Sequence, residues 1–103
     1  MSELVINKFA QRDLERIVNY LRLELCNPQA ADNHLAEVSR VYSLLRDNPE
    51  IFQLARDPAL RLKGYRVAPI NNYLMVYRHD GGSDTVHVLR FFHSLQDYAR
   101  ILK

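Results

Sequence analysis

The chain has 103 residues and a mass of 12.1 kDa. Of these residues, 48% are hydrophobic and 25% are charged. This length allows one hydrophobic core and excludes two, and the composition excludes an intrinsically disordered chain. We therefore expect a single globular domain over residues 1–103. No stretch approaches the roughly 20 apolar residues that span a bilayer, and no basic segment with a long apolar run opens the chain. These features predict a cytoplasmic protein with no membrane partner.

Charge is spread unevenly around a net value of +2. Residues 1–55 carry six basic and eight acidic side chains, whereas residues 56–103 carry eight and four. A polyanion would be attracted to the second half, although so small a surplus is equally expected of solvated rim residues. Cys26 is the only cysteine, which excludes an internal disulfide and fits a reducing compartment. We expect it inside a helix as a small apolar residue.

The first half of the chain predicts a short strand at Leu4–Ile6 and two helices. Asn7 is placed to start the first helix, whose apolar stripe is Leu14, Ile17, Val18, Leu21 and Leu25. Asn27-Pro28 starts the second helix, since Asn caps a first turn and Pro suits its first position. Asn48-Pro49 ends it. Its predicted stripe is Ala31, Leu35, Val38, Tyr42 and Leu45, widened by Val41 and Leu44. The short link predicts an antiparallel helical hairpin.

The second half predicts an antiparallel meander. An ordered loop with a bend at Asp57-Pro58 leads into three runs rich in β-branched and aromatic residues. The expected strands are Tyr65–Ala68, Tyr73–His79 and Thr85–Phe92, with turns at Pro69–Asn72 and Asp80–Asp84 and a C-terminal tail from Leu95. The predicted fold class is thus α+β, in the order β-α-α-β-β-β plus a tail.

Alternation assigns the strand residues to faces. Tyr73, Met75 and Tyr77 share one face. In the last strand we expect Val86, Val88 and Phe92 on one face and Leu89 and Phe91 on the other. A strand apolar on both faces is typically central. One face of the sheet would then pack on the helical hairpin, and the other needs a tail, a partner or a ligand.

The chain has no sequence signature of a metal or cofactor site, so neither is expected. Its four histidines lack ligand spacing, and no phosphate loop or nucleophile elbow is present. A sparse polar set remains on the meander: Arg66, Arg78, Arg90, His93 and Tyr98. Such residues could cleave RNA without metal, since His transfers protons near neutral pH and Arg stabilises a phosphate.

The same polar set has a structural interpretation. The arginines could be rim charges or could pair with a partner protein, and His93 and the tyrosines could be packing residues. If the last strand has no bulge, Arg90 and His93 point to opposite faces, and one cleft could hold only one of them.

Six segments occur in an order that we recognise. They are Ala10-x-x-Asp13-Leu14-x-x-Ile17-x-x-Tyr20, Asn27-Pro28-x-Ala30-Ala31, Asn48-Pro49, Leu62-x-Gly64-Tyr65-Arg66, Asn72-Tyr73-Leu74-Met75-Val76-Tyr77-Arg78, and Val88-Leu89-Arg90-x-x-His93-x-x-x-Asp97-Tyr98. Through them nearly the whole chain resembles the RelE/ParE superfamily of bacterial type II toxins. The resemblance implies a RelE-like fold, with a curved antiparallel sheet packed on an N-terminal helical hairpin. It also implies growth arrest as the output and a cognate antitoxin as partner, which would cover the second sheet face.

The resemblance leaves two targets. RelE-type members cleave mRNA in the ribosomal A site, and for that activity Arg66, His93 and Tyr98 are the candidate catalytic residues. ParE-type members bind DNA gyrase and do not cleave RNA. Arg78, Arg90 and Asp97 are candidate binding residues.

Two features favour gyrase. Ala68 and Leu74 stand where RelE-type enzymes would carry Lys or Arg, and the His93-x-x-x-Asp97-Tyr98 tail is closer to the ParE-like branch. We therefore favour gyrase inhibition, with ribosome-dependent mRNA cleavage as the alternative and a non-toxic binding module on the same fold as a further one.

Overall fold

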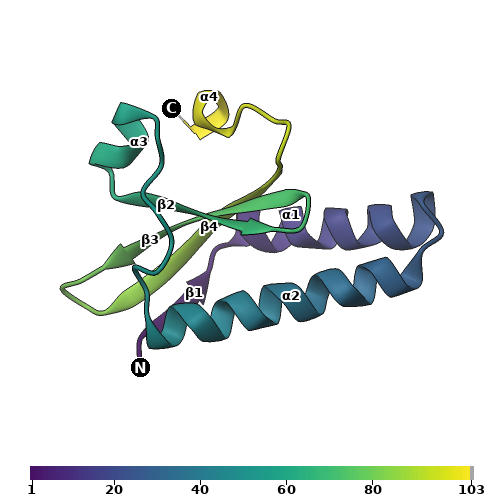
Figure 1. Ribbon diagram of the computed structural model, residues 1–103, viewed down its shortest axis with the longest axis horizontal. Coiled ribbons are helices and arrows are strands. Elements are labelled where there is room, and N and C mark those ends of the chain that lie inside the picture. Colours follow the sequence, from purple (N-terminus) through teal and green to yellow (C-terminus); the bar gives the residue numbers. More distant parts are fainter. Residues whose placement is uncertain (103) are drawn as a thin grey trace.

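The computed structural model describes residues 1–102 and has one four-stranded sheet in the order β1-β4-β3-β2, with a long helical hairpin on one side (Figure 1). The elements are β1 (Glu3–Ile6), α1 (Lys8–Asn19), the π-helix η1 (Tyr20–Glu24), α2 (Pro28–Asp47), α3 (Pro58–Leu62), β2 (Tyr65–Ile70), β3 (Tyr73–Asp80), β4 (Thr85–His93) and α4 (Tyr98–Leu102). The predicted α+β class and element order are confirmed. Among the described residues, none of the helices has the length and apolarity of a membrane-spanning segment.

Asparagine side chains set the starts of both long helices, as predicted. The Asn7 side-chain oxygen accepts a hydrogen bond from the Ala10 amide at 2.8 Å. Asn27 does the same for Ala30 at 3.1 Å, with Pro28 in the first turn of α2. These caps satisfy amides that have no partner within the helix. Local chemistry therefore fixes where the hairpin helices begin.

The π-helix η1 changes the phase of the first helix. A π-turn advances less per residue than an α-turn, so side chains beyond it rotate away from the preceding stripe. Leu21 is still half-buried, but Leu25 is exposed. Cys26 follows outside the helix with φ 48° and is also exposed. Two predictions are thus wrong: the apolar stripe does not reach Leu25, and Cys26 is not helical.

The buried stripe of α2 is rotated from the predicted one. Leu35 is exposed, whereas His34 is buried. The buried positions are Ala31, His34, Val38, Val41 and Leu45. The apolar residues of this helix span a wide arc, so periodicity alone could not decide which part of the arc faces the sheet.

The meander of β2, β3 and β4 is antiparallel as predicted, and β1 adds to its edge in parallel with β4. β2 is longer than expected and extends to Ile70, because Pro69 is tolerated in an edge strand. The turn is accordingly only Asn71-Asn72, with Asn71 at φ 55°. β4 is central, as its two apolar faces predicted.

A β-bulge in β4 reverses two of the predicted side-chain positions. Val76 pairs with Arg90 but Tyr77 pairs with Val88, so Leu89 is an extra residue. Phe91 consequently joins the main core, and Phe92 faces the other side. The predicted assignment of these two phenylalanines was therefore wrong. Arg90 and His93 both follow the bulge and still lie on opposite faces.

The main core lies between the sheet and the hairpin. It joins Ala10 and Ile17 of α1 and three residues of α2 to the strand residues Ala68, Ile70, Met75, Tyr77, Val86, Val88 and Phe91. The opposite side of the sheet, here called the outer face, has only α3, α4 and loops beside it (Figure 1). Tyr98 of α4 packs on it against Phe92, with ring centroids 6.1 Å apart. The C-terminal tail thus covers part of the outer face. A tail was one of the three covers predicted for this face, beside a partner and a ligand.

Candidate functional site

Arg66 lies on the helix-covered side of the sheet and is bonded within the chain. It pairs with Tyr77 in the β2–β3 register, which places it on that side. Its guanidinium donates to the Phe52 carbonyl at 2.8 Å and to a Glu50 carboxylate oxygen at 3.4 Å. Its side chain is 18% exposed. A phosphate would have to compete with both partners.

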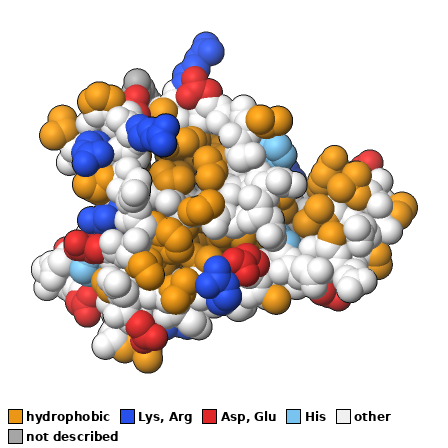
Figure 2. Space-filling model, in the orientation of Figure 1, with side chains coloured by type: hydrophobic (Ala, Val, Ile, Leu, Met, Phe, Trp, Pro, Cys, Tyr) orange, Lys and Arg blue, Asp and Glu red, His pale blue; other side chains and the backbone are white. Residues whose placement is uncertain are grey.

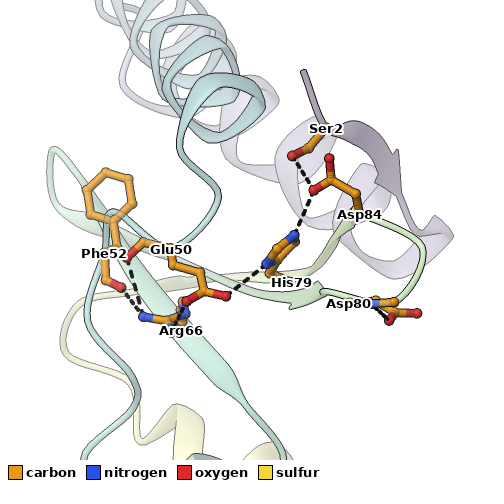
Figure 3. A network of polar contacts seen from close by, with 8 residues as sticks. Ser2, Glu50, Phe52, Arg66, His79, Asp80 and Asp84 are labelled. Atoms are coloured by element: carbon orange, nitrogen blue, oxygen red, sulfur yellow. Dashed lines mark hydrogen bonds and ion pairs between the residues drawn. The ribbon is translucent and has the colours of Figure 1, made fainter.

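Arg66 belongs to a larger polar cluster, the His79 network, shown in Figure 3. His79 Nδ1 lies 3.0 Å from Glu50 Oε2, and His79 Nε2 lies 2.9 Å from Asp84 Oδ1. Ser2 donates to the same Asp84 oxygen at 2.7 Å. Hydrogen bonds from Glu50 and then Asp84 raise the pKa of His79. The network links the N-terminus, the segment after α2, β2 and the β3–β4 turn.

His93 lies at the opposite end of the same side, in a row of three rings. Tyr73 stands between His34 and His93, with centroid distances of 5.1 and 5.3 Å and both contacts edge-on. Two cavities of about 270 and 440 Å³ adjoin this row and share Leu21, Asn72 and Tyr73. We call them the hairpin cleft. Its other lining residues include Arg16, Tyr20, Asn33 and Asn71.

His34 forms the buried wall of the hairpin cleft. Its Nδ1 lies 3.4 Å from the Asn71 side-chain nitrogen, and its Nε2 has no hydrogen-bond partner among the described residues. Since an amide nitrogen donates, Nδ1 is assigned as the acceptor and Nε2 carries the proton. Burial lowers the pKa of His34. Burial also raises the pKa of Tyr73, with a smaller contribution from Tyr20.

Arg90 is held by a buried carboxylate. Its Nε and Nη2 donate to the two oxygens of Asp13 at 2.6 and 3.1 Å, and the Phe91 amide donates to Asp13 at 3.0 Å. β1 pairs with β4 only as far as Val88, so this amide has no strand partner on that edge. Asp13 thus completes the edge of β4 and fixes Arg90.

The remaining candidates lie on or beside the outer face. Arg78 pairs with Tyr65 and His87 there and is partly exposed. Tyr98 begins α4 over Phe92. Asp97 is exposed and accepts the Arg100 amide at 3.3 Å.

The three candidate catalytic residues do not converge. Arg66 and His93 pair with Tyr77 and Tyr73, which are four residues apart on β3. At the strand rise this separation is about 13 Å. Tyr98 is on the other side of the sheet.

The outer face carries a groove of about 440 Å³ between α4 and the segment that precedes α3. We call it the outer groove; it is lined by Gln53, Leu54, Ala55, Arg56, Val67, Pro69, Leu74 and Tyr98. The strand residues in this lining are all apolar. Lys and Arg side chains gather around α3 and α4, beside exposed apolar surface (Figure 2). The groove therefore offers an apolar floor with one basic side chain, Arg56, in its lining.

Sequence reasoning missed His34, His79 and Glu50. His34 follows Ala31 by three residues, so both lie on one face of α2. The burial of His34 could have been predicted from the sequence only if the buried face of α2 had been known. The Glu50–His79 contact joins residues 29 positions apart and has no local signal. Within residues 1–102, no three His, Cys, Asp or Glu side chains are grouped closely enough to hold a metal ion.

Comparison with solved structures supports the fold. The chain is similar to the toxin–antitoxin complex RelBE2 from Mycobacterium tuberculosis, with TM-score 0.63 and 24% identity over 89% of this chain and 96% of that chain. It is similar to the chromosomal ParDE system from P. aeruginosa, with TM-score 0.69 and 18% identity over 90% and 96%. It is also similar to the intact E. coli RelBE toxin–antitoxin complex, with TM-score 0.60 and 13% identity over 93% of this chain and 100% of that chain. At these identities the likeness concerns the fold.

The family is shown by sequence. A search of the curated proteins finds no match. The family model described as ParE toxin of type II toxin–antitoxin system, parDE, matches residues 4–98. That match covers nearly the whole described chain, including both helices of the hairpin, most of β1 and all of β2, β3 and β4. The chain therefore belongs to the ParE toxin family of type II toxin–antitoxin systems, within the RelE/ParE superfamily.

Proposed function

We propose that this toxin arrests growth by binding DNA gyrase without cleaving RNA, and that a cognate antitoxin neutralises it. The observation that carries the proposal is the separation of Arg66, His93 and Tyr98. Metal-free RNA cleavage needs a base, an acid and a cation around one phosphate, each within hydrogen-bond reach. Here the separation is about 13 Å along β3 for two of them, and the third is across the sheet.

The cations also favour binding over catalysis. Arg66 is bonded to Glu50 and Phe52, and Arg90 to Asp13. The floor of the outer groove is apolar where an RNA-cleaving site would need positive charge. An apolar floor with Arg56 beside it is suited to a protein partner that presents apolar and acidic side chains.

We propose the outer face as the gyrase-binding surface, with the tail from Asp97 as part of it; Lys103 lies outside the described residues. The deciding experiment runs a supercoiling assay with purified gyrase beside primer extension on ribosome-bound mRNA. We expect loss of supercoiling with intact message. Tyr98→Ala should weaken inhibition about tenfold or more, since a central interface aromatic is commonly worth over 1 kcal/mol. Tyr20→Ala, an exposed tyrosine on the hairpin, is the matched control and should leave inhibition unchanged.

One observation favours the enzymatic alternative. His93, Tyr73 and Arg16 line the same cleft, so a base and a cation are both near the open space. Codon-spaced cuts that disappear in His93→Ala would establish ribosome-dependent cleavage and overturn the gyrase proposal. If neither assay responds, the chain is a non-toxic binding module on the same fold.

The antitoxin proposal rests on uncovered apolar surface. Tyr20, Leu23 and Leu25 are 47%, 68% and 53% exposed at the end of the hairpin, which stands apart from the sheet (Figure 2). Monomeric proteins rarely leave such groups clustered. Co-expression with the protein encoded next to this gene should raise soluble yield and give a co-purifying complex. Normal growth and a monodisperse monomer without any partner would contradict this.

A further inference from the structure

The segment Glu50–Ala55, here called the edge segment, lies along the free edge of β2. The Val67 amide donates to the Gln53 carbonyl at 3.1 Å, and the Ala55 amide donates to the Tyr65 carbonyl at 2.8 Å. The edge segment therefore occupies hydrogen-bonding positions that an edge strand would otherwise expose. Its last residues also form one wall of the outer groove.

Side chains of the His79 network hold the beginning of the edge segment. Arg66 reaches the Phe52 carbonyl, and Glu50 receives both Arg66 and His79 (Figure 3). Asp84, in the β3–β4 turn, anchors the other side of the His79 ring. The His79 side chain is only 12% exposed, whereas its partners Glu50 and Asp84 are 57% and 58% exposed.

The contacts of the imidazole define its charge. Each ring nitrogen lies within 3.0 Å of a carboxylate oxygen, one from Glu50 and one from Asp84. A neutral imidazole has a single N–H, so one nitrogen lone pair would face an anionic oxygen. The imidazolium donates to both carboxylates, and such charge-assisted hydrogen bonds are the stronger kind.

We infer that His79 is a proton-dependent switch: its imidazolium closes the edge segment on β2, and loss of the proton as pH rises releases that segment, opening the β2 edge and one wall of the outer groove. The inference does not depend on the identity of the toxin's target. It assigns a role to residues that the proposed function does not use.

The surrounding charges fix the direction of the switch. His79 faces Glu50 and Asp84; Arg66 lies beside Glu50, and the N-terminal ammonium acts on Asp84. The pKa of His79 is raised above 6.5 by Glu50 first and Asp84 second. His79 lowers the pKa of Glu50, and Ser2 and then His79 lower that of Asp84, so both remain anionic while His79 titrates. The edge segment is therefore fully closed at pH values below the pKa of His79 in the unfolded chain. It is released as pH rises through the raised pKa of His79 in the folded chain.

The test needs no variant in its first arm. Nitrogen-15 NMR of the imidazoles, recorded from about pH 5 to 9, should show both His79 nitrogens protonated up to a higher pH than in an unperturbed histidine. Amide exchange at Ala55 and Val67, corrected for hydroxide catalysis and compared with amides inside β3, should accelerate as His79 titrates. A His79 midpoint at or below 6.5, or an unchanging exchange ratio, would overturn the inference.

Matched variants separate the switch from general loosening. Glu50→Gln keeps the shape of the side chain but removes its charge, so it should lower the His79 midpoint and speed exchange at Ala55 and Val67 near pH 6. His79→Gln should abolish the pH dependence of that exchange. Glu37→Gln breaks an exposed ion pair with Arg40 on α2 and should change neither readout. If Glu50→Gln behaves like Glu37→Gln, His79 does not control the edge segment.

Discussion

The two ends of the helix-covered side of the sheet shift the pKa of a histidine in opposite directions. At the hairpin cleft, His34 is packed against Tyr73 without any anionic hydrogen-bond partner, and burial lowers its pKa. At the other end, His79 lies between two carboxylates, which raise its pKa. Burial thus favours the neutral form of His34 on α2, and the carboxylates favour the charged form of His79 on β3.

The difference shows which force organises each end. At the cleft, apolar packing and desolvation dominate, because burial lowers the pKa of His34 more than the charge of Glu37 raises it. At the His79 network, opposite charges compensate one another at a partly exposed edge. A rise in pH should therefore act mainly on the edge, whereas packing substitutions should act mainly on the hairpin and its core.

The largest expected effect concerns the two halves of α2. Leu45 is fully buried near the network end, and Leu35 is exposed toward the hairpin end. Leu45→Ala should lower the free energy of unfolding by about 2–5 kcal/mol, the cost of truncating a buried leucine. Leu35→Ala should cost less than about 1 kcal/mol, because little surface leaves water there. Urea denaturation of both variants checks this, and equal losses would mean that the phase of α2 is misassigned.

A smaller effect is expected at Asp13, midway between the two ends. Asp13→Ala leaves the Arg90 guanidinium and the Phe91 amide without their acceptor. We expect a loss of about 1.5–3 kcal/mol in thermal or urea unfolding. Arg16→Ala removes a mostly exposed partner of the same carboxylate and should cost below about 1 kcal/mol. Similar costs for the two variants would contradict a structural role for the buried pair.

At the cleft end, an apolar replacement should be tolerated. His34→Leu removes a buried Nε2 proton that has no partner among the described residues. Since an unsatisfied buried donor costs about 1–3 kcal/mol, we expect stability to stay level or rise by about 1 kcal/mol. A clear loss, measured by the same denaturation, would show that the contact between His34 Nδ1 and the Asn71 side chain is essential to the fold.

The smallest effect, and the sharpest for the comparison, is the pH dependence of stability. The depressed pKa of His34 means that the unfolded chain takes up its proton first, so stability falls as pH drops below about 6.5. The raised pKa of His79 has the opposite sign, with stability lost as pH rises through it. His34→Leu should therefore reduce the acid-side loss, and His79→Gln the alkaline-side loss. Unfolding midpoints near pH 5.5, 6.5 and 8.5 distinguish these outcomes; identical profiles would refute both charge assignments.

The sequence by itself determined the order of the main elements and several of their limits. Asn7, Asn27-Pro28 and Asn48 mark helix ends through hydrogen bonds to neighbouring residues, so their effect is local. The three strands and the central place of the last one followed from alternation and composition. The ordered motifs led to the right family, because they preserve these local features along nearly the whole chain.

Tertiary structure alone decided which side chains meet. The bulge at Leu89 exchanged the faces of Phe91 and Phe92, since a single inserted residue reverses alternation. The rotation of α2 buried His34 in place of Leu35 because the sheet, not the helix, selects the packed arc. The charge of His79 depends on residues 29 and 5 positions away in sequence, and such distant contacts leave no periodic trace in the chain.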